Sequence, residues 1–404
     1  MKTEGRQFTV MVPQADAMGA IAAIRSLGEH GYRVIAASNN PEALGLKSSF
    51  TAKAILSPAY DEGYIDWLRG LIQAEKIDAI VHSEGFLVAI RDAFDEFKHL
   101  MCLPQAEADA YLSMSKTETF ALFLNSDDPL LKANIPPTAV ISPMQPANWS
   151  EISTWPLPLF VKGDATYAND GESSVVKRLL TVDEAKQCVE ELSKGFSELL
   201  IQGCVKGAKA TVNVVIENNQ ILAESMVLAT HHNPHTGGLT ALRHSWWHEE
   251  MYQDALLRLR ALRWQGAAMV EYAWDQSTQT FNFIELNARY WAALNVDILA
   301  GLHFPAIQMD SFLKGKRPDM PLRLTKKICA RHTFPADYGY LLSLAKDKQV
   351  GVGKKVYALV EFFWLMLHPG IKADLLYPGD RKLYWINLGA FLRRSWNDIK
   401  RKFV

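Results

Sequence analysis

The chain has 404 residues, of which 49% are hydrophobic and 22% are charged. This composition is typical of a soluble globular protein and excludes a disordered chain, a collagen and a mucin-like stalk. Lys and Arg number 43 and Asp and Glu number 44, so the formal net charge is −1. We expect no nucleic-acid partner, because the chain has no overall basic footprint, and a local basic patch is the alternative. At roughly 100–200 residues per domain, the length predicts two or three domains.

The four cysteines, at positions 102, 188, 204 and 329, form no CxxC pair. This spacing argues against a zinc site or a redox dithiol, and free thiols fit a reducing compartment. The N-terminus lacks the apolar core of a signal peptide. No apolar run reaches the roughly 18 residues that a transmembrane helix needs. We therefore expect a cytoplasmic protein.

Strand-like and helix-like stretches alternate in the first part of the chain. The expected strands are 8–13, 33–38 and 77–82, and the expected helices are 17–30, 60–75 and 85–99. This alternation predicts a parallel sheet with helical crossovers. Only Gly19 stands where the dinucleotide-binding glycines would follow the first strand, which disfavours an NAD-dependent dehydrogenase. We expect a Rossmann-like domain over residues 1–105.

A helical segment over 107–133 and an irregular segment over 143–158 precede a change in character. The expected strands are then 159–163, 199–203, 210–217, 221–229, 267–274 and 280–286, with helices at 181–194, 249–262 and 297–314. Short strands joined by turns such as Asn218-Asn219 indicate antiparallel sheets. We expect an α+β domain over 106–320 and a helical tail over 321–404.

Two acidic strands near the end of this domain form the most informative pattern. Glu271 and Glu285 lie on strands joined by a turn, so the strand pair can bring both carboxylates to one face. Asn287, two residues past Glu285, points to the same side, and Arg289 continues the alternation. Carboxylate and amide oxygens suit Mg²⁺ on nucleotide phosphates, and a guanidinium suits phosphate or carboxylate. The alternative is a salt-bridged polar strand face.

Three further pieces could meet a nucleotide. Lys162 lies near the end of a buried strand, where burying its charge costs free energy unless the side chain meets an anion. The polar loop 164–174 that follows could hold phosphates and close as a lid. The strand end at Gln202 and the turn through Val205 could read an adenine edge. Lys116 starts a helix. A solvated lysine at 116 or 162 and a packing amide at 202 are the alternatives.

In this order, the pieces resemble the ATP-grasp superfamily. The similarity covers about residues 8–315 and is nearest to a subgroup with "G-x-x-x-VE…D…EINxRxW", whose members act, or are thought to act, as carboxylate–amine ligases. The resemblance implies a Rossmann-like domain ahead of two α+β lobes that hold ATP between them.

The resemblance also implies residue roles. Lys116 and Lys162 would contact the ATP phosphates, Gln202 and the backbone of Val205 the adenine, and Glu271, Glu285 and Asn287 would hold magnesium, or manganese in its place. Arg289 would bind phosphate or the substrate carboxylate. Two positions depart from the pattern. Gln202 stands where many relatives have Glu, and Lys209 stands where many have an acidic ribose contact.

The implied reaction is ATP-dependent, ADP-forming ligation of a small-molecule carboxylate to an amine through an acyl phosphate. It requires no covalent nucleophile on the enzyme. An ATP-dependent kinase or a thiol ligase on the same fold is one alternative, and a nucleotide-binding protein without turnover is another. The two substrates and the oligomeric state stay open, a homo-oligomer included.

Two weaker substrate contacts complete the candidate site. Arg243 lies in the histidine-rich segment 231–244, for which we expect a substrate-facing loop, with an ordinary surface loop as the alternative. Glu84 follows the third expected strand at the carboxyl edge of the first sheet, where such sheets bind ligands. A turn or helix cap is the alternative for Glu84.

The tail combines aromatic helices with basic residues. Apolar stretches over 356–367 and 383–391 are followed by Arg393-Arg394 and by the cluster 400–402. Such helices could lie on an anionic membrane surface as a peripheral contact. The alternative is that they pack against the ATP-binding lobes.

Overall fold

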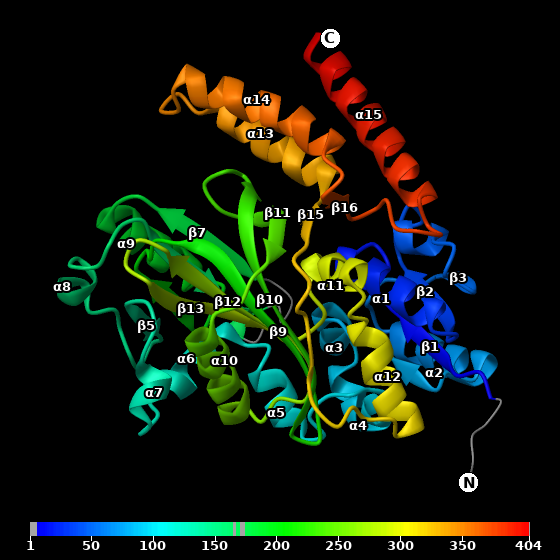
Figure 1. The fold of residues 1–404 in the computed structure, drawn as a ribbon. Coiled ribbons are helices and arrows are strands. Elements are labelled where there is room, and N and C mark those ends of the chain that lie inside the picture. The colour runs from blue at the N-terminus through cyan, green and yellow to red at the C-terminus, as the bar shows by residue number, and fades with distance from the viewer. Residues whose placement is uncertain (1–5, 165–166, 170–173, 404) are drawn as a thin grey trace.

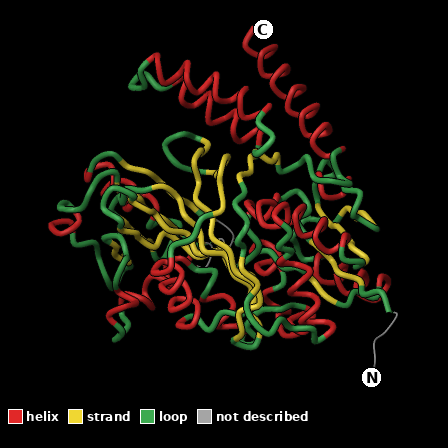
Figure 2. The backbone as a smooth tube through the Cα atoms, in the orientation of Figure 1, coloured by secondary structure: helices red, strands yellow, loops and turns green. Residues whose placement is uncertain are grey.

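The computed structural model describes residues 6–164, 167–169 and 174–403 of the chain. The described residues form three sheets with helices between and around them (Figures 1 and 2). This mixed α/β architecture, with a parallel sheet first and antiparallel sheets after it, confirms the expected fold class.

The first sheet is parallel and has the strand order β3-β2-β1-β4. Its strands are β1 (Thr9–Val12), β2 (Arg33–Ser38), β3 (Lys53–Leu56) and β4 (Ala79–Ile80), and its helices α1 (Met18–Glu29) and α2 (Tyr64–Glu75). The apolar side chains of β1 and β2 are buried, as expected for a parallel strand covered on both faces.

Two details of this region differ from the prediction. The helix expected over 85–99 is broken into α3 (Glu84–Ala89), a 3₁₀ turn and α4 (Phe94–Phe97). β3 was not predicted, because its side chains are mostly exposed and it has no alternating pattern. β3 lies at the edge of the sheet and pairs only with β2.

The second sheet is antiparallel, with the order β5-β8-β6-β7. It contains β5 (Thr138–Ile141), β6 (Leu159–Gly163), β7 (Val175–Leu179) and β8 (Leu199–Gln202), with α8 (Trp149–Ile152) and α9 (Val182–Leu192) beside it. A capping box between Thr181 and Glu184 fixes the start of α9. The helical segment expected over 107–133 consists of three helices, α5 (Glu107–Leu112), α6 (Lys116–Leu124) and α7 (Pro129–Lys132).

The third sheet is the largest and carries the acidic strands. Its order is β13-β12-β9-β10-β11-β15-β16, and β14 pairs with β10. The strands are β9 (Ala208–Glu217), β10 (Gln220–Asn233), β11 (Leu239–Ser245), β12 (Gly266–Asp275), β13 (Thr280–Asn287), β14 (Leu322–Arg323), β15 (Cys329–Arg331) and β16 (Ile371–Ala373). α10 (Glu249–Ala261) packs on it through Met251, Ala255 and Leu259 in one hydrophobic core.

The first and third sheets meet beside the end of β13. There α1 packs against α11 (Asn295–Ala300) and α12 (Phe304–Lys314), which were expected as one helical piece. Gly19 permits the close approach, because a Cβ at this position would lie 2.9 Å from the carbonyl oxygen of Trp291. The N-terminal helix is thereby held next to the segment that follows Arg289.

The tail is more than a set of helices. Its strands β14, β15 and β16 join the large sheet, and α13 (Tyr338–Lys346), α14 (Val352–Leu367) and α15 (Lys382–Phe403) stand above it (Figure 1). One face of these helices packs on the molecule, with Phe391 against Phe334 and Tyr338 and Leu383 against Ile21. No helix in the described part of the chain is both long and apolar enough to cross a membrane.

Candidate active site

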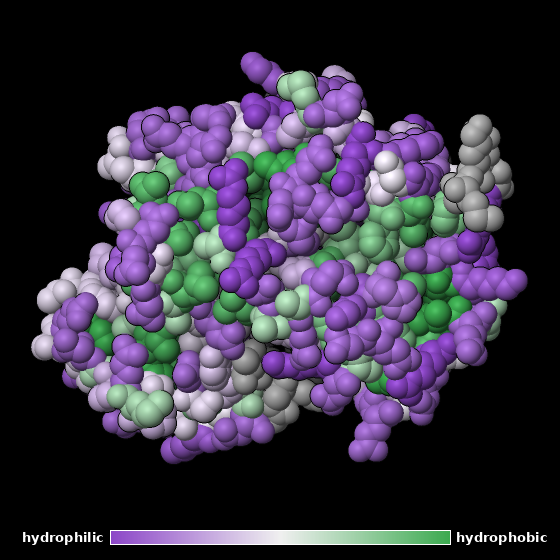
Figure 3. Space-filling view, turned by 90° about the horizontal axis from the view of Figure 1, so that it is seen from below, coloured by the Kyte–Doolittle hydropathy of each residue, from purple (hydrophilic) through white to green (hydrophobic). Residues whose placement is uncertain are grey.

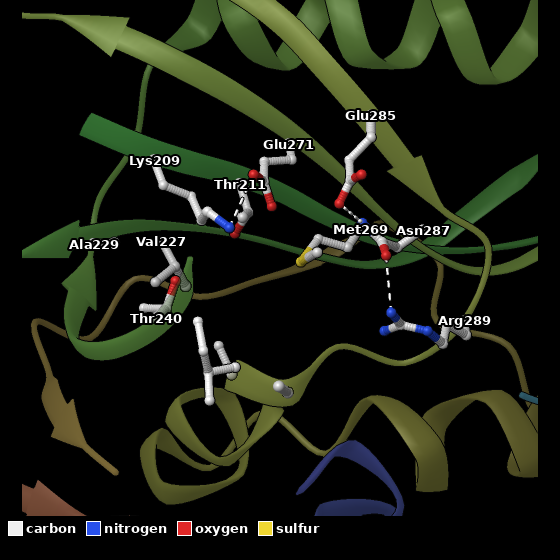
Figure 4. Close-up of a pocket in the computed structure, with 13 residues that line it drawn as sticks. Lys209, Thr211, Val227, Ala229, Thr240, Met269, Glu271, Glu285, Asn287 and Arg289 are labelled. Atoms are coloured by element: carbon white, nitrogen blue, oxygen red, sulfur yellow. Dashed lines mark hydrogen bonds and ion pairs between the residues drawn. The ribbon is translucent and has the colours of Figure 1, made fainter. Parts of the chain in front are cut away.

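The two candidate metal-binding carboxylates face each other across neighbouring strands. The register of β12 and β13 pairs Glu271 directly with Glu285, as the turn between the strands predicts. A β-bulge follows Glu271, which is a common way to aim a side chain at a site. Both side chains point into the same pocket (Figure 4).

A chain of polar contacts extends from Glu285 to the start of α3. The Asn287 side-chain amide donates to Oε1 of Glu285 at 3.2 Å, and Arg289 donates from Nη2 to Oδ1 of Asn287 at 2.9 Å. Nε of Arg289 lies 3.3 Å from Oε2 of Glu84, at the start of α3. Glu84 is thus part of the cluster although it lies far away in sequence.

Two lysines form ion pairs with the facing carboxylates of Glu271 and Glu285. Nζ of Lys116 lies 2.9 Å from Oε2 of Glu285, and Nζ of Lys209 lies 2.9 Å from Oε1 of Glu271. Lys209 sits on β9, the strand that pairs with β12 on the side away from β13. Lys209 thus forms an ion pair with Glu271. The presence of a lysine at this position does not by itself indicate that partner.

Lys116 is aimed by a contact that the sequence analysis missed. Ser115 caps the start of α6, and buried Asp164 at the end of β6 accepts hydrogen bonds from Ser115 Oγ at 2.9 Å and from the Thr117 amide at 3.1 Å. Asp164 therefore fixes the first turn of α6 to the second sheet. The sequence did contain a signal for this contact, namely an acidic residue directly after the strand that carries Lys162.

Lys162 and Gln202 meet side by side in the second sheet. Nζ of Lys162 donates to Oε1 of Gln202 at 2.6 Å, and Nε2 of Gln202 donates to Thr138 Oγ1 at 3.0 Å. Both polar atoms of Gln202 thus have protein partners. Val205 lies in the turn between β8 and β9, where its carbonyl accepts from Cys204 Sγ at 3.6 Å.

Burial and neighbouring charges shift the pKa values of these groups in different directions. Burial raises the pKa of Glu271 despite its ion pair with Lys209. Burial would raise the pKa of Glu285 as well, but the charge and hydrogen bond of Lys116 hold it far below its usual range. Burial lowers the pKa of Lys162 to about 8. Partial burial would lower the pKa of Lys116, but the charge and hydrogen bond of Glu285 outweigh it and raise that pKa.

Three hollows converge on these residues. A cavity of about 180 Å³ lies between Glu271, Glu285 and the β10–β11 hairpin residue Thr240. One of about 390 Å³ is lined by Lys116, Glu84 and Asn287. The third, of about 270 Å³, lies at the carboxyl ends of β1 and β4 and shares Arg289 with the first. The site therefore has separate space on each side of the Glu285–Asn287–Arg289 chain.

Arg243 is the main correction to the expected site. Its side chain is 1% exposed, and its two Nη atoms donate to the two carboxylate oxygens of Asp374 at 2.8 Å. The segment 231–244 is also not one loop, because 231–233 end β10 and 239–244 belong to β11, which leaves only 234–238 to connect the two strands. Arg243 is an ion pair within the protein and not an available substrate contact.

Part of the expected lid lies outside the described residues, namely 165–166 and 170–173 of the loop 164–174. Of its described members, Tyr167 donates to Glu118 on α6 at 3.2 Å.

The donor set fits a hard divalent cation. Glu271, Glu285 and Asn287 supply carboxylate and amide oxygens on one face of the strand pair, the ligand type that Mg²⁺ prefers. In the described part of the chain, no group of three or more His, Cys, Asp or Glu is placed to hold a metal ion. A cation at this pair would therefore need further oxygen ligands, such as nucleotide phosphates or water.

No protein-family model matches the chain. Solved structures similar to it include N5-carboxyaminoimidazole synthetase from Staphylococcus aureus complexed with ADP, with 15% identity, a TM-score of 0.59, and coverage of 80% of this chain and 82% of that one. Biotin carboxylase from Campylobacter jejuni has 15% identity, a TM-score of 0.57, and coverage of 78% and 72%. L-amino acid ligase from Bacillus licheniformis has 15% identity, a TM-score of 0.55, and coverage of 76% and 75%. At this identity, the likeness establishes the fold.

Proposed function

We propose that this chain, which has the ATP-grasp fold, is an ATP-dependent, ADP-forming ligase that joins a small-molecule carboxylate to an amine. The observation that carries the proposal is the direct pairing of Glu271 with Glu285, with Lys116 and Lys209 each at 2.9 Å from one of the two carboxylates. Two carboxylates flanked by cations suit a nucleotide triphosphate with its metal ion.

The residues around Glu271 and Glu285 form the crevice of the proposed active site, and most of them have a proposed task. Glu271, Glu285 and Asn287 hold Mg²⁺, or Mn²⁺, which neutralises charge on the ATP phosphates when it is bound. Lys116 and Lys162 contact phosphate oxygens. The adenine lies by Gln202 and the backbone of Val205, where the Gln202 amide has to exchange one of its present partners. Arg289 binds the acyl carboxylate, with Glu84 holding its guanidinium in place.

The reaction then proceeds in two balanced steps. An oxygen of the substrate carboxylate attacks the γ-phosphorus of ATP, ADP leaves, and an acyl phosphate forms. The amine nitrogen attacks the acyl carbon, inorganic phosphate leaves, and the nitrogen loses a proton to give the amide. The residues contribute by orienting the reactants and by stabilising charge, since no side chain has to form a covalent bond.

The chain is proposed to act as three units, residues 1–105, 106–320 and 321–404. Arg289 lines both the cavity beside Glu271 and the one at the carboxyl ends of β1 and β4. The second of these cavities is therefore the proposed place for one of the two substrates. The first sheet ends there, at the edge where parallel sheets bind ligands.

The test is ADP release from Mg·ATP across a panel of amino acids, dipeptides and uronic acids, with and without amine acceptors, followed by mass spectrometry of the products. A ligase releases ADP only when both a carboxylate and an amine are present, and a new amide appears. A phosphorylated product without an amide supports the kinase alternative, and a thioester supports the thiol ligase. ATP binding without ADP release under every condition contradicts the proposal in favour of a binding protein.

A further inference from the structure

The outer face of α14 is apolar and has no partner in the described chain. Large exposed side chains follow one another along three turns of the helix: Val356, Tyr357, Leu359, Val360, Phe363, Trp364, Met366 and Leu367. Leu367 is 85% exposed, Val360 62% and Trp364 54%. Continuous apolar surface of this kind is rare on soluble monomers unless it binds something.

The inner face of α14 already has its packing partners. Ala358 and Phe362 are buried against Leu341 and Leu344 of α13, and Phe362 contacts Phe334. Glu361, the one charged residue in the sequence between Val356 and Leu367, faces inward, with Oε2 at 3.5 Å from Nε2 of His231. The outer face is therefore both apolar and uncharged, and it is not the core face of the helix.

Positive charge gathers on the same part of the chain. Residues 338–404 contain 12 Lys and Arg but five Asp and Glu, a net charge of +7, whereas residues 1–337 carry a net charge of −8. Two of the five acids, Asp374 and Asp380, are buried in ion pairs with Arg243 and Arg25. Lys348, Lys354, Lys372, Arg393 and Arg394 are exposed, so the surface formed by residues 338–404 is more basic than the count suggests.

The arms formed by α13–α14 and α15 project from one end of the molecule (Figure 1). α15 also exposes tryptophans, with Trp385 at 64% and Trp396 at 60%. The face viewed from below in Figure 3 is mostly hydrophilic, with apolar residues in scattered patches. Apolar side chains, tryptophans and basic residues on elements that project from the same end of a molecule are the combination that favours a membrane interface.

We infer that the outer face of α14, with the basic residues of the arms around it, docks the protein on an anionic lipid membrane without crossing it. The apolar side chains enter the boundary between headgroups and acyl chains, and Lys and Arg meet the lipid phosphates. A second copy of this chain is the less favoured occupant, because apposing two such faces would bring two net charges of +7 together.

The arm that docks is connected through α13 to a wall of the proposed active site. The β10–β11 hairpin, which contributes Thr240 to the cavity beside Glu271, is bound to α13 by the His235 amide donating to Ser343 Oγ at 2.8 Å. The His235 ring also lies 3.0 Å from Oδ2 of Asp347. The arm and the hairpin therefore form one connected unit.

The test is flotation of the full-length protein with vesicles of phosphatidylcholine alone and of phosphatidylcholine with phosphatidylglycerol. Binding is expected only with the anionic vesicles, and it should weaken as NaCl is raised. The double variant Trp364→Glu/Leu367→Glu should bind at least about tenfold more weakly. The matched control Met144→Glu/Met320→Glu changes two exposed methionines elsewhere and should bind like the wild type.

Thermal unfolding of each variant checks that it is folded. Failure of the wild-type chain to bind anionic vesicles would overturn the inference, as would equal binding by the α14 double variant. Sedimentation velocity supplies the remaining outcome. A wild-type dimer that the α14 double variant converts to monomers would assign the face to a second copy instead of a membrane.

Discussion

Two sets of ion pairs with the same chemistry serve different purposes in this molecule. In the crevice, Lys116 and Glu285 lie 2.9 Å apart, and their side chains are 34% and 24% exposed. At the seam where β11 meets the segment that follows β16, Arg243 and Asp374 lie 2.8 Å apart, and both side chains are 1% exposed. Lys116 and Glu285 each line a cavity, whereas Arg243 and Asp374 line none of the three cavities around the site.

The difference in exposure determines what can replace each partner. A ligand phosphate or a cation can displace the Lys116–Glu285 contact, because both groups already border open space. The Arg243–Asp374 pair has no such exchange partner, and breaking it leaves a charge buried and unpaired. The sequence alone offers both Arg289 and, as a weaker candidate, Arg243 as contacts for a phosphate or carboxylate, and their surroundings in the fold separate them.

The largest expected effect comes from the seam. Arg243→Met leaves the Asp374 carboxylate buried without its bidentate partner, which should lower the free energy of unfolding by about 3–5 kcal/mol. Chemical denaturation measures the loss, and the paired variant Arg243→Met/Asp374→Leu should recover part of it. A normal unfolding free energy together with a raised KM for the carboxylate substrate would restore Arg243 as a substrate contact.

A smaller effect is expected in the crevice. Lys116→Met removes a proposed phosphate contact and should lower kcat/KM for ATP by about 100-fold, while the unfolding free energy changes little. Lys186→Met, on the exposed side of α9, is the matched control and should leave both quantities unchanged. If Lys116→Met unfolds the protein and leaves turnover of the folded fraction normal, the Lys116–Glu285 pair serves stability, as the Arg243–Asp374 pair does, and the proposed difference between them is wrong.

The pH dependence of ATP binding should separate the two lysines. The pKa of Lys162 is lowered to about 8 by burial, so the side chain is cationic below that pH and loses its charge above it. KM for ATP should therefore rise up to about tenfold between pH 7 and pH 9 from this group alone. Lys162→Arg keeps its charge over this range and should flatten the profile. A wild-type KM that is constant from pH 7 to pH 9 would contradict the phosphate contact.

The sequence was sufficient where the signal is local. β2 and β6 were predicted at the bounds that the structure has, because each is a short apolar run next to a turn. The pairing of Glu271 with Glu285 was also predictable, since a single turn of the chain connects their strands. The two-residue alternation along β13 also predicted that Asn287 lies beside Glu285, and Arg289, two residues past the end of that strand, contacts Asn287.

The sequence was insufficient where the partner is remote. Arg243 and Asp374 are 131 residues apart, and nothing in the histidine-rich pattern around Arg243 indicates that pairing. The partner of Lys209 depends on the register between β9 and β12, which only the folded sheet defines. The tail strands β15 and β16 are short, and their membership in the large sheet depends on its other strands.

The central claim is that the facing carboxylates bind a metal–nucleotide complex. Isothermal titration calorimetry of ATP, with and without Mg²⁺, tests it most directly on the wild type and on Glu271→Gln/Glu285→Gln, with Glu190→Gln on the exposed side of α9 as the control. We predict one ATP site per chain, tightened by Mg²⁺ in the wild type and in the control but not in the double variant. Equal tightening by Mg²⁺ in all three proteins would contradict the account.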